Sequence, residues 1–188
     1  MNRDDLLHLL TLEGLALLGR VHYDDKADVL KLVSTLRAEG HDPALVAAVL
    51  SQAKLRRRAV SKFGEFAESM LFTEAGLEQA TRLNVAAQHA ERFRAAGIAQ
   101  VADLGCGIGT ESMALASLGL NVAAFEIDEV TAAVASYNLA PFDTAEVKQA
   151  DVTTLDTDAF EALMFDPARR ELGGPARERA VRKFNPAD

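Results

Sequence analysis

The chain has 188 residues, of which 49% are hydrophobic, and a formal net charge of −8 at pH 7. This hydrophobic content is sufficient for a packed core, while the negative charge argues against a uniformly basic nucleic-acid-binding protein. The single cysteine, Cys106, excludes an intrachain disulfide and suits a reducing compartment, so we expect a cytoplasmic protein. The polar N-terminus and the short apolar runs predict no signal peptide and no membrane partner.

The first part of the chain reads as helix. Apolar residues recur at helical spacing over residues 4–18 and 29–36, and Asp42 followed by Pro43 is typical of a new helix start. No strand pattern occurs before residue 98. We therefore predict a helical N-terminal domain over residues 1–70 and a second domain over residues 71–188.

The charges are unevenly distributed. Residues 54–62 contain five basic residues and no acid, and residues 169–184 contain six basic residues and two acids. The stretch between them, residues 99–166, is acidic. A solvated helix face explains either basic patch alone, but together they keep RNA as a candidate partner.

From residue 98 the pattern alternates between strands and helices. Strands are predicted over residues 98–104, 120–125, 145–149 and 162–165, with helices over residues 110–118 and 129–139. This alternation predicts an α/β fold with a Rossmann-like parallel sheet of about four strands. Ligands of such sheets bind at the carboxyl ends of the strands, and each predicted strand ends in or beside an acid. These acids are Asp103, Glu126, Asp151 and Asp166.

A glycine turn follows the first predicted strand. Gly105, Gly107 and Gly109 allow backbone to approach a ligand closely, and the following helix offers unpaired N–H groups. A dinucleotide site requires the pattern G-x-G-x-x-G, which is not met here, and Asp103 would repel a pyrophosphate. A nicotinamide-dependent oxidoreductase is therefore disfavoured. Cys106 is expected to be a small filler in this turn, and no metal site is predicted.

These motifs carry a family resemblance. Residues 103–109 resemble the first motif of class I S-adenosylmethionine-dependent methyltransferases, and the resemblance covers roughly residues 72–170. It implies that Glu126 holds the ribose hydroxyls and that Asp151 lies near the adenine amino group. Glu126 ends its strand without an evident local group to cap, which favours this role. The cofactor-binding residues implied in this part are Asp103, Gly105, Cys106, Gly107, Gly109, Glu126, Ile127, Asp151 and Val152.

A closer resemblance extends upstream. Residues 63–81 are similar to those of bacterial methyltransferases with a THUMP-like domain, which resemble the RNA cap guanine-N2 methyltransferases of the trimethylguanosine synthase type. By this analogy, the mouth of the cofactor site is lined by Phe72, Thr73, Gln79 and Thr81. The alternative, in which Phe72 is a core residue and Thr81 a surface residue, remains equally open.

Asp166 and Pro167 resemble the start of the Asp/Asn-Pro-Pro-aromatic motif of enzymes that methylate amino nitrogens. The resemblance implies that the Asp166 carboxylate and the Pro167 carbonyl hold the amine hydrogens and direct the nitrogen lone pair. The usual second proline and aromatic residue are replaced by Ala168 and Arg169. Arg169 or Arg170 could instead stack on a base or pair with a phosphate, or could simply pair with nearby acids.

A sheet of this class has seven strands, whereas four are predicted here. We therefore expect the N-terminal part of a longer enzyme, with an open sheet edge covered by the tail or by a second copy of the chain. The leading hypothesis is an S-adenosylmethionine-dependent methyltransferase acting on an amino nitrogen of RNA or another nucleic acid. The alternative is a catalytically inert module that binds S-adenosylmethionine or RNA.

Overall fold

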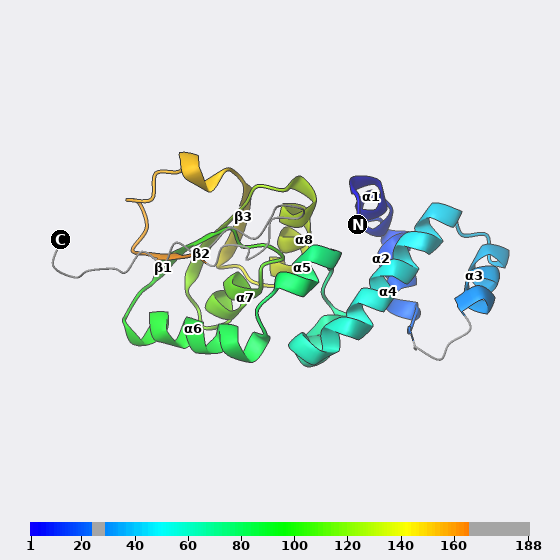
Figure 1. Ribbon diagram of the computed structural model, residues 1–188, viewed down its shortest axis with the longest axis horizontal. Coiled ribbons are helices and arrows are strands. Elements are labelled where there is room, and N and C mark those ends of the chain that lie inside the picture. The colour runs from blue at the N-terminus through cyan, green and yellow to red at the C-terminus, as the bar shows by residue number, and fades with distance from the viewer. Residues whose placement is uncertain (24–28, 166–188) are drawn as a thin grey trace, which may run out of the picture.

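The computed structural model describes residues 1–23 and 29–165, and Figure 1 shows its arrangement. Helices occupy the N-terminal part, as the sequence predicts. No helix in these described ranges has the length and apolar character needed to cross a membrane. The elements of this part are α1 (Arg3–Leu9), α2 (Leu12–Arg20), α3 (Val29–Ala38), α4 (Pro43–Phe63) and the 3-10 helix η1 (Gly64–Glu68).

Local capping explains where α4 begins. The Asp42 carboxylate accepts hydrogen bonds from the backbone N–H groups of Ala44 and Leu45, and Pro43 occupies the first helical position. Proline is favoured at this position because its missing N–H has no intrahelical partner to lose. The predicted helix start at Asp42 and Pro43 is therefore confirmed.

Helices and parallel strands alternate in the second part of the chain. For the four strands and the two helices whose bounds were predicted, the observed bounds lie within two residues, and those of α8 and β3 agree with the prediction. The elements are α5 (Glu74–Gln79), α6 (Leu83–Ala95), β1 (Gln100–Leu104), α7 (Thr110–Ser117), β2 (Asn121–Glu126), α8 (Glu129–Leu139), β3 (Ala145–Gln149), the 3-10 helix η2 (Val152–Thr154) and β4 (Ala162–Met164).

The strand order of the sheet is β3-β2-β1-β4, and all three strand pairs are parallel. The order reverses beside β1, because β2 and the much later β4 lie on its two sides. The register places Asp103 opposite both Ala124 of β2 and Met164 of β4. In sheets of this kind the crevice at such a reversal, at the carboxyl ends of the strands, is where ligands bind.

One continuous core joins the helical part to the sheet. It runs from Leu9 and Val49 through Phe63 and Phe72 to Val101, and includes the inner faces of α6, α7 and α8. The opposite face of the sheet carries a smaller cluster of Ala102, Leu104 and Phe125, against which the residues after β3 pack. The separation of the chain into two domains at residue 70 stays a prediction.

The basic stretch on α4 is engaged within the molecule. Arg56 Nε donates to the carbonyl of Met70 at 2.8 Å, and Arg58 forms an ion pair with Glu74. Lys62 Nζ donates to the last carbonyls of α5 and the residue after it, those of Leu77, Glu78 and Ala80, at 2.7–2.8 Å. These three side chains therefore have partners within the molecule, and an RNA-binding role of the stretch stays a prediction.

Replacement of Asp42 by alanine removes both capping bonds at the start of α4. We expect the free energy of unfolding to fall by about 1 kcal/mol, because two N–H groups lose their acceptor in the folded state. Urea titration followed by circular dichroism measures this change. The exposed Asp143, replaced by alanine, serves as the control for loss of one negative charge; an equal effect of the two substitutions would contradict the capping role.

Candidate functional site at the carboxyl ends of the strands

The glycine turn between β1 and α7 has a backbone that requires glycine. Gly105, Gly107 and Gly109 have φ angles of 84°, 57° and 88°, in the left-handed region that side chains disfavour. A Cβ atom built at Gly105 or Gly107 would meet no atom within 4 Å, whereas one at Gly109 would lie 3.3 Å from Leu139. The first two glycines therefore border open space, and the third allows close packing behind the turn.

Glu126 bridges the end of β2 and the glycine turn. One carboxylate oxygen accepts a hydrogen bond from the N–H of Gly107 at 3.0 Å, and the other accepts from the N–H of Asp128 at 3.0 Å. The expectation that Glu126 caps no local group is therefore wrong, because the chain turns back on it directly after the strand. Its neighbour Ile127 is 63% exposed, so an apolar surface adjoins the carboxylate.

Asp103 lies beneath the turn. It is 3% exposed and its carboxylate accepts a hydrogen bond of 2.5 Å from the hydroxyl of Ser112 in α7. In this conformation the side chain offers almost no surface to a ligand. Its observed contact instead fixes the first turn of α7 to the end of β1.

Cys106 is buried, and burial raises the pKa of its thiol, with the nearby Asp103 and Glu126 charges adding to the effect. A thiol that stays protonated is a poor nucleophile. This environment agrees with the expected role of Cys106 as a small filler in the turn.

Two buried polar atoms lacking a hydrogen-bond partner, among the residues described, directly follow the glycine turn. They are Thr110 Oγ1 and Glu111 Oε2. The other oxygen of Glu111 lies 3.1 Å from His89 Nδ1 on α6. An unpaired buried polar atom costs about 1–3 kcal/mol, so a hydroxyl left unpaired beside an open loop indicates a place for a polar ligand or water. Neither residue was expected in the site from the sequence, although both follow the third glycine immediately.

Asp151 follows β3 at the same sheet edge as Glu126, which pairs with the last residue of β3, Gln149. Its Oδ1 accepts from both the N–H and the hydroxyl of Thr153, and these bonds lower the pKa of Asp151. Asp151 is exposed and caps η2, while Val152 is half-buried against the cluster of Ala102, Leu104 and Phe125.

Three of the residues expected at the cofactor mouth are placed differently from one another. Phe72 has no exposed surface and packs on Phe63 with ring centroids 5.4 Å apart, so in this conformation its ring is a core group. Thr73 is 8% exposed and its hydroxyl caps α5 by accepting from the N–H of Gly76. Thr81 is half-buried between α5 and α6.

The residues expected to contact the methyl acceptor, Asp166, Pro167, Arg169 and Arg170, lie outside the described residues. The strand before them, β4, pairs with β1 beside Asp103.

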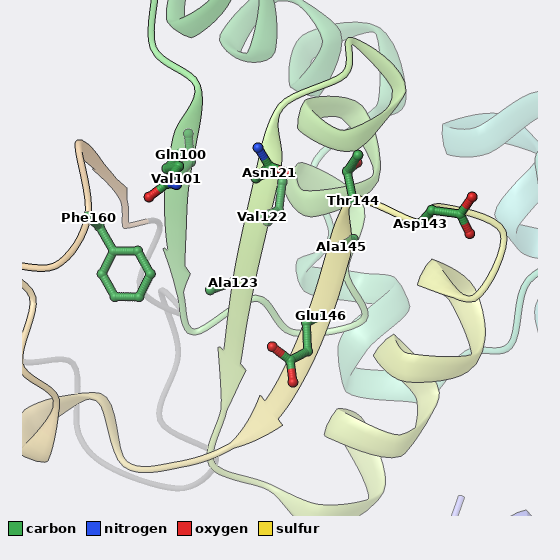
Figure 2. Close-up of a pocket in the computed structure, with 10 residues that line it drawn as sticks. All are labelled: Gln100, Val101, Asn121, Val122, Ala123, Asp143, Thr144, Ala145, Glu146 and Phe160. Atoms are coloured by element: carbon green, nitrogen blue, oxygen red, sulfur yellow. The ribbon is translucent and has the colours of Figure 1, made fainter.

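A cavity of about 290 Å³ lies at the opposite edge of the sheet, near the amino ends of β1, β2 and β3. Phe160 lies on its β1 side, and Asp143 and Glu146 come from its β3 side (Figure 2). Because its lining includes none of the glycine turn, we place the candidate site at the carboxyl ends of the strands rather than in this cavity. Over the ranges 1–23 and 29–165, no three His, Cys, Asp or Glu side chains group as metal ligands.

Comparisons with known proteins give matches over two parts of the chain. Residues 2–59 match a family model described as a domain of unknown function, DUF8688. Two proteins of Mycobacterium tuberculosis, from strains CDC 1551 / Oshkosh and ATCC 25618 / H37Rv, are named uncharacterized S-adenosylmethionine-dependent methyltransferases. Each is 40% identical to this chain over 126 residues, which make up 63% of this chain and 34% of the relative. The chain thus spans about a third of the length of these relatives.

A solved structure shares the fold. A protein of Porphyromonas gingivalis W83, named provisionally as a methyltransferase, matches 71% of this chain and 37% of its own, with 21% sequence identity and a TM-score of 0.50. At this identity the likeness shows a common α/β architecture.

The raised pKa of Cys106 predicts low reactivity of the folded protein. At pH 8.5 we expect iodoacetamide to modify the folded chain at least about ten-fold more slowly than the chain in denaturant, because alkylation requires the thiolate. Mass spectrometry of timed samples measures the rate.

The same shift makes stability depend on pH. Above the ordinary thiol pKa of about 8.5, the unfolded chain loses the Cys106 proton while the folded chain keeps it, so rising pH favours unfolding. A Cys106→Ser variant should lack this part of the alkaline loss of stability. Equal modification rates in the folded and unfolded chains, or an unchanged alkaline slope in the variant, would contradict this environment.

Proposed function

We propose that the protein is an S-adenosylmethionine-dependent methyltransferase and that its cofactor binds at the glycine turn. The observation that carries this proposal is the open space at Gly105 and Gly107, which adjoins the Glu126 carboxylate and the exposed Ile127. The names of the two mycobacterial relatives support it. The unpaired hydroxyl of Thr110 fits a site whose polar ligand completes the hydrogen bonds.

The residues of this site match the parts of that cofactor. Glu126 already accepts two N–H donors, and a carboxylate at this position can accept hydrogen bonds from the two ribose hydroxyls. Ile127 offers an apolar surface to the adenine ring, and Asp151 is exposed at the same edge. The acidic character of this edge also favours a cofactor that carries an ammonium and a sulfonium.

Bound at this turn, the cofactor would supply a methyl group on a positively charged sulfur. The chain's task is then to place an acceptor atom in line with that methyl group and to exclude water, which requires positioning rather than a nucleophilic side chain. We propose Asp166 and Pro167 for this task, with an amino nitrogen of RNA or another nucleic acid as the acceptor. The Asp-Pro motif after β4 and the neighbouring Arg169 and Arg170 support this choice.

Isothermal titration with S-adenosylmethionine tests the cofactor site. We expect the wild-type chain to bind, and Glu126→Gln to weaken binding by about ten-fold, because the amide loses the charge and one acceptor oxygen. Glu129→Gln is the matched control, since it removes one charge nearby and only an exposed ion pair with Arg3. Absence of binding by the wild-type chain would overturn the proposed function; equal weakening by both variants would overturn the role of Glu126.

Transfer of a labelled methyl group to a pool of tRNA and rRNA tests the acceptor. We expect incorporation that Asp166→Ala reduces at least about hundred-fold, since the amine loses a hydrogen-bond acceptor that directs its lone pair. Asp158→Ala, which removes an exposed acid from the segment before β4, is the control. Cofactor binding without transfer to RNA would favour the inert binding module over the enzyme.

A further inference from the structure

We propose that two buried amides, Gln52 and Asn138, position the glycine turn, and that the helical N-terminal region thereby supports the cofactor site. This inference rests on the proposed function for its consequence, but the coupling itself is a property of the free protein.

The segment of residues 70–73 makes the first link. It is neither helix nor strand, yet Leu71 and Phe72 have no exposed surface. Buried backbone of this kind must find partners for its N–H and C=O groups, because water cannot reach them. Side chains distant in sequence supply those partners here.

Gln52 holds one residue of the segment. Its amide nitrogen donates to the carbonyl of Phe72 at 2.6 Å, and its amide oxygen accepts from the N–H of Phe72 at 3.1 Å. Gln52 is 1% exposed and lies on α4, inside the matched family domain of residues 2–59. The Gln52 side chain therefore bonds both the N–H and the C=O of Phe72, as a residue of an adjacent β-strand would.

Asn138 holds the other residue and extends the link. Its amide oxygen accepts from the N–H of Leu71 at 2.8 Å, and its nitrogen donates to the carbonyl of Leu71 at 3.0 Å. The same nitrogen donates to the carbonyl of Ile108, in the glycine turn, at 2.9 Å. Both amide hydrogens have acceptors, so this one side chain joins α8, the 70–73 segment and the glycine turn.

Close packing reinforces the link. A Cβ built at Gly76 would lie 2.3 Å from Cγ2 of Ile108, so the first turn of α5 contacts the glycine turn without room for a side chain. The opposite end of α5 is held by Lys62 Nζ through the three carbonyl bonds described above. Partial burial, together with the positive charge of nearby Arg82, lowers the pKa of Lys62.

One face of α4 supplies most of these contacts. Gln52, Arg56 and Phe63 are separated by four and seven residues, which places them on one side of a helix. All three contact residues 70–72: Gln52 and Phe63 contact Phe72, and Arg56 contacts the Met70 carbonyl. We infer that this face positions residues 70–73, and through Asn138 the glycine turn, so that Gln52 and Asn138 are positioning residues for cofactor binding.

Hydrogen exchange of the free chain tests the coupling. Gln52→Met keeps the side-chain volume but loses both bonds to Phe72. Asn138→Asp keeps an acceptor for the N–H of Leu71 but loses the donations to the carbonyls of Leu71 and Ile108 and adds a buried carboxylate. We expect both variants to raise exchange of the backbone amides of residues 105–110 by at least about ten-fold, because each loses two buried hydrogen bonds. Val46→Ala, which creates a cavity on the same helix, is the control for a loss of stability alone. When the variants are compared at equal fractions of folded protein, it should raise exchange at residues 105–110 by less than about two-fold.

Cofactor titration tests the consequence. Gln52→Met and Asn138→Asp should weaken S-adenosylmethionine binding by about ten-fold, and Val46→Ala by less than about two-fold. If wild-type binds and all three variants bind alike, the positioning role is overturned. If wild-type does not bind, the proposed function fails, and exchange at residues 105–110 alone decides the coupling.

Lys62→Gln keeps the inference testable should the buried variants fail to fold. The Lys62 side chain is half-buried, so the substitution frees the end of α5 without altering the core. We expect exchange at residues 105–110 to rise about three-fold. Exchange in this stretch equal to wild-type would overturn the link through α5.

Discussion

The structure depends on how two buried residues, Leu71 and Phe72, satisfy their backbone groups. They lie in the core without belonging to a helix or a sheet, so four strong hydrogen-bonding groups would be left unpaired without the side chains of Gln52 and Asn138. One amide comes from the helical region and the other from the layer that covers the sheet. Because each contributes a reciprocal pair of bonds, the segment fixes the two layers relative to each other.

The glycine turn of the candidate site is likewise held by hydrogen bonds and packing from residues distant in the sequence. The glycine turn has few contacts of its own on its open side, and its position is set by Phe125, Glu126, Asn138 and the packing at Ile108. All four of these groups come from β2, α8 or the loop itself. A further connection runs from Asn138 through Leu71 and its neighbour Phe72 to Gln52 on α4. A ligand at the turn therefore meets a backbone that is held from behind by these contacts.

Much of the fold was predictable from the sequence because buried parallel strands and covering helices have distinct apolar periods. The bounds of α8 and β3, and the acids at the strand ends, follow from that pattern alone. The polar contacts were not predictable in the same way. Gln52 reads as a break in an apolar stripe and Lys62 as a surface cation, since nothing local shows that each meets backbone 15–20 residues away.

In the candidate site too, the sequence motifs were predictable and the polar contacts were not. The three glycines and the strand-end acids were found by motif and spacing, and the structure brings the glycine turn and Glu126 into contact. The role of Glu126 as a cap was missed because it depends on the chain reversing after β2. The unpaired atoms of Thr110 and Glu111 were missed because burial is a property of the assembled layers, not of the residues.

The bond between Leu71 and Asn138 spans 67 residues, and this separation has a consequence for synthesis on the ribosome. Phe72 leaves the exit tunnel 20 residues after Gln52, about 1–4 s later at typical elongation rates, so α4 can hold one side of the segment early. The other side waits until α8 has emerged, which at typical elongation rates is about 3–13 s later. Until then the N–H and C=O groups of Leu71 lack the partners that Asn138 supplies in the folded chain.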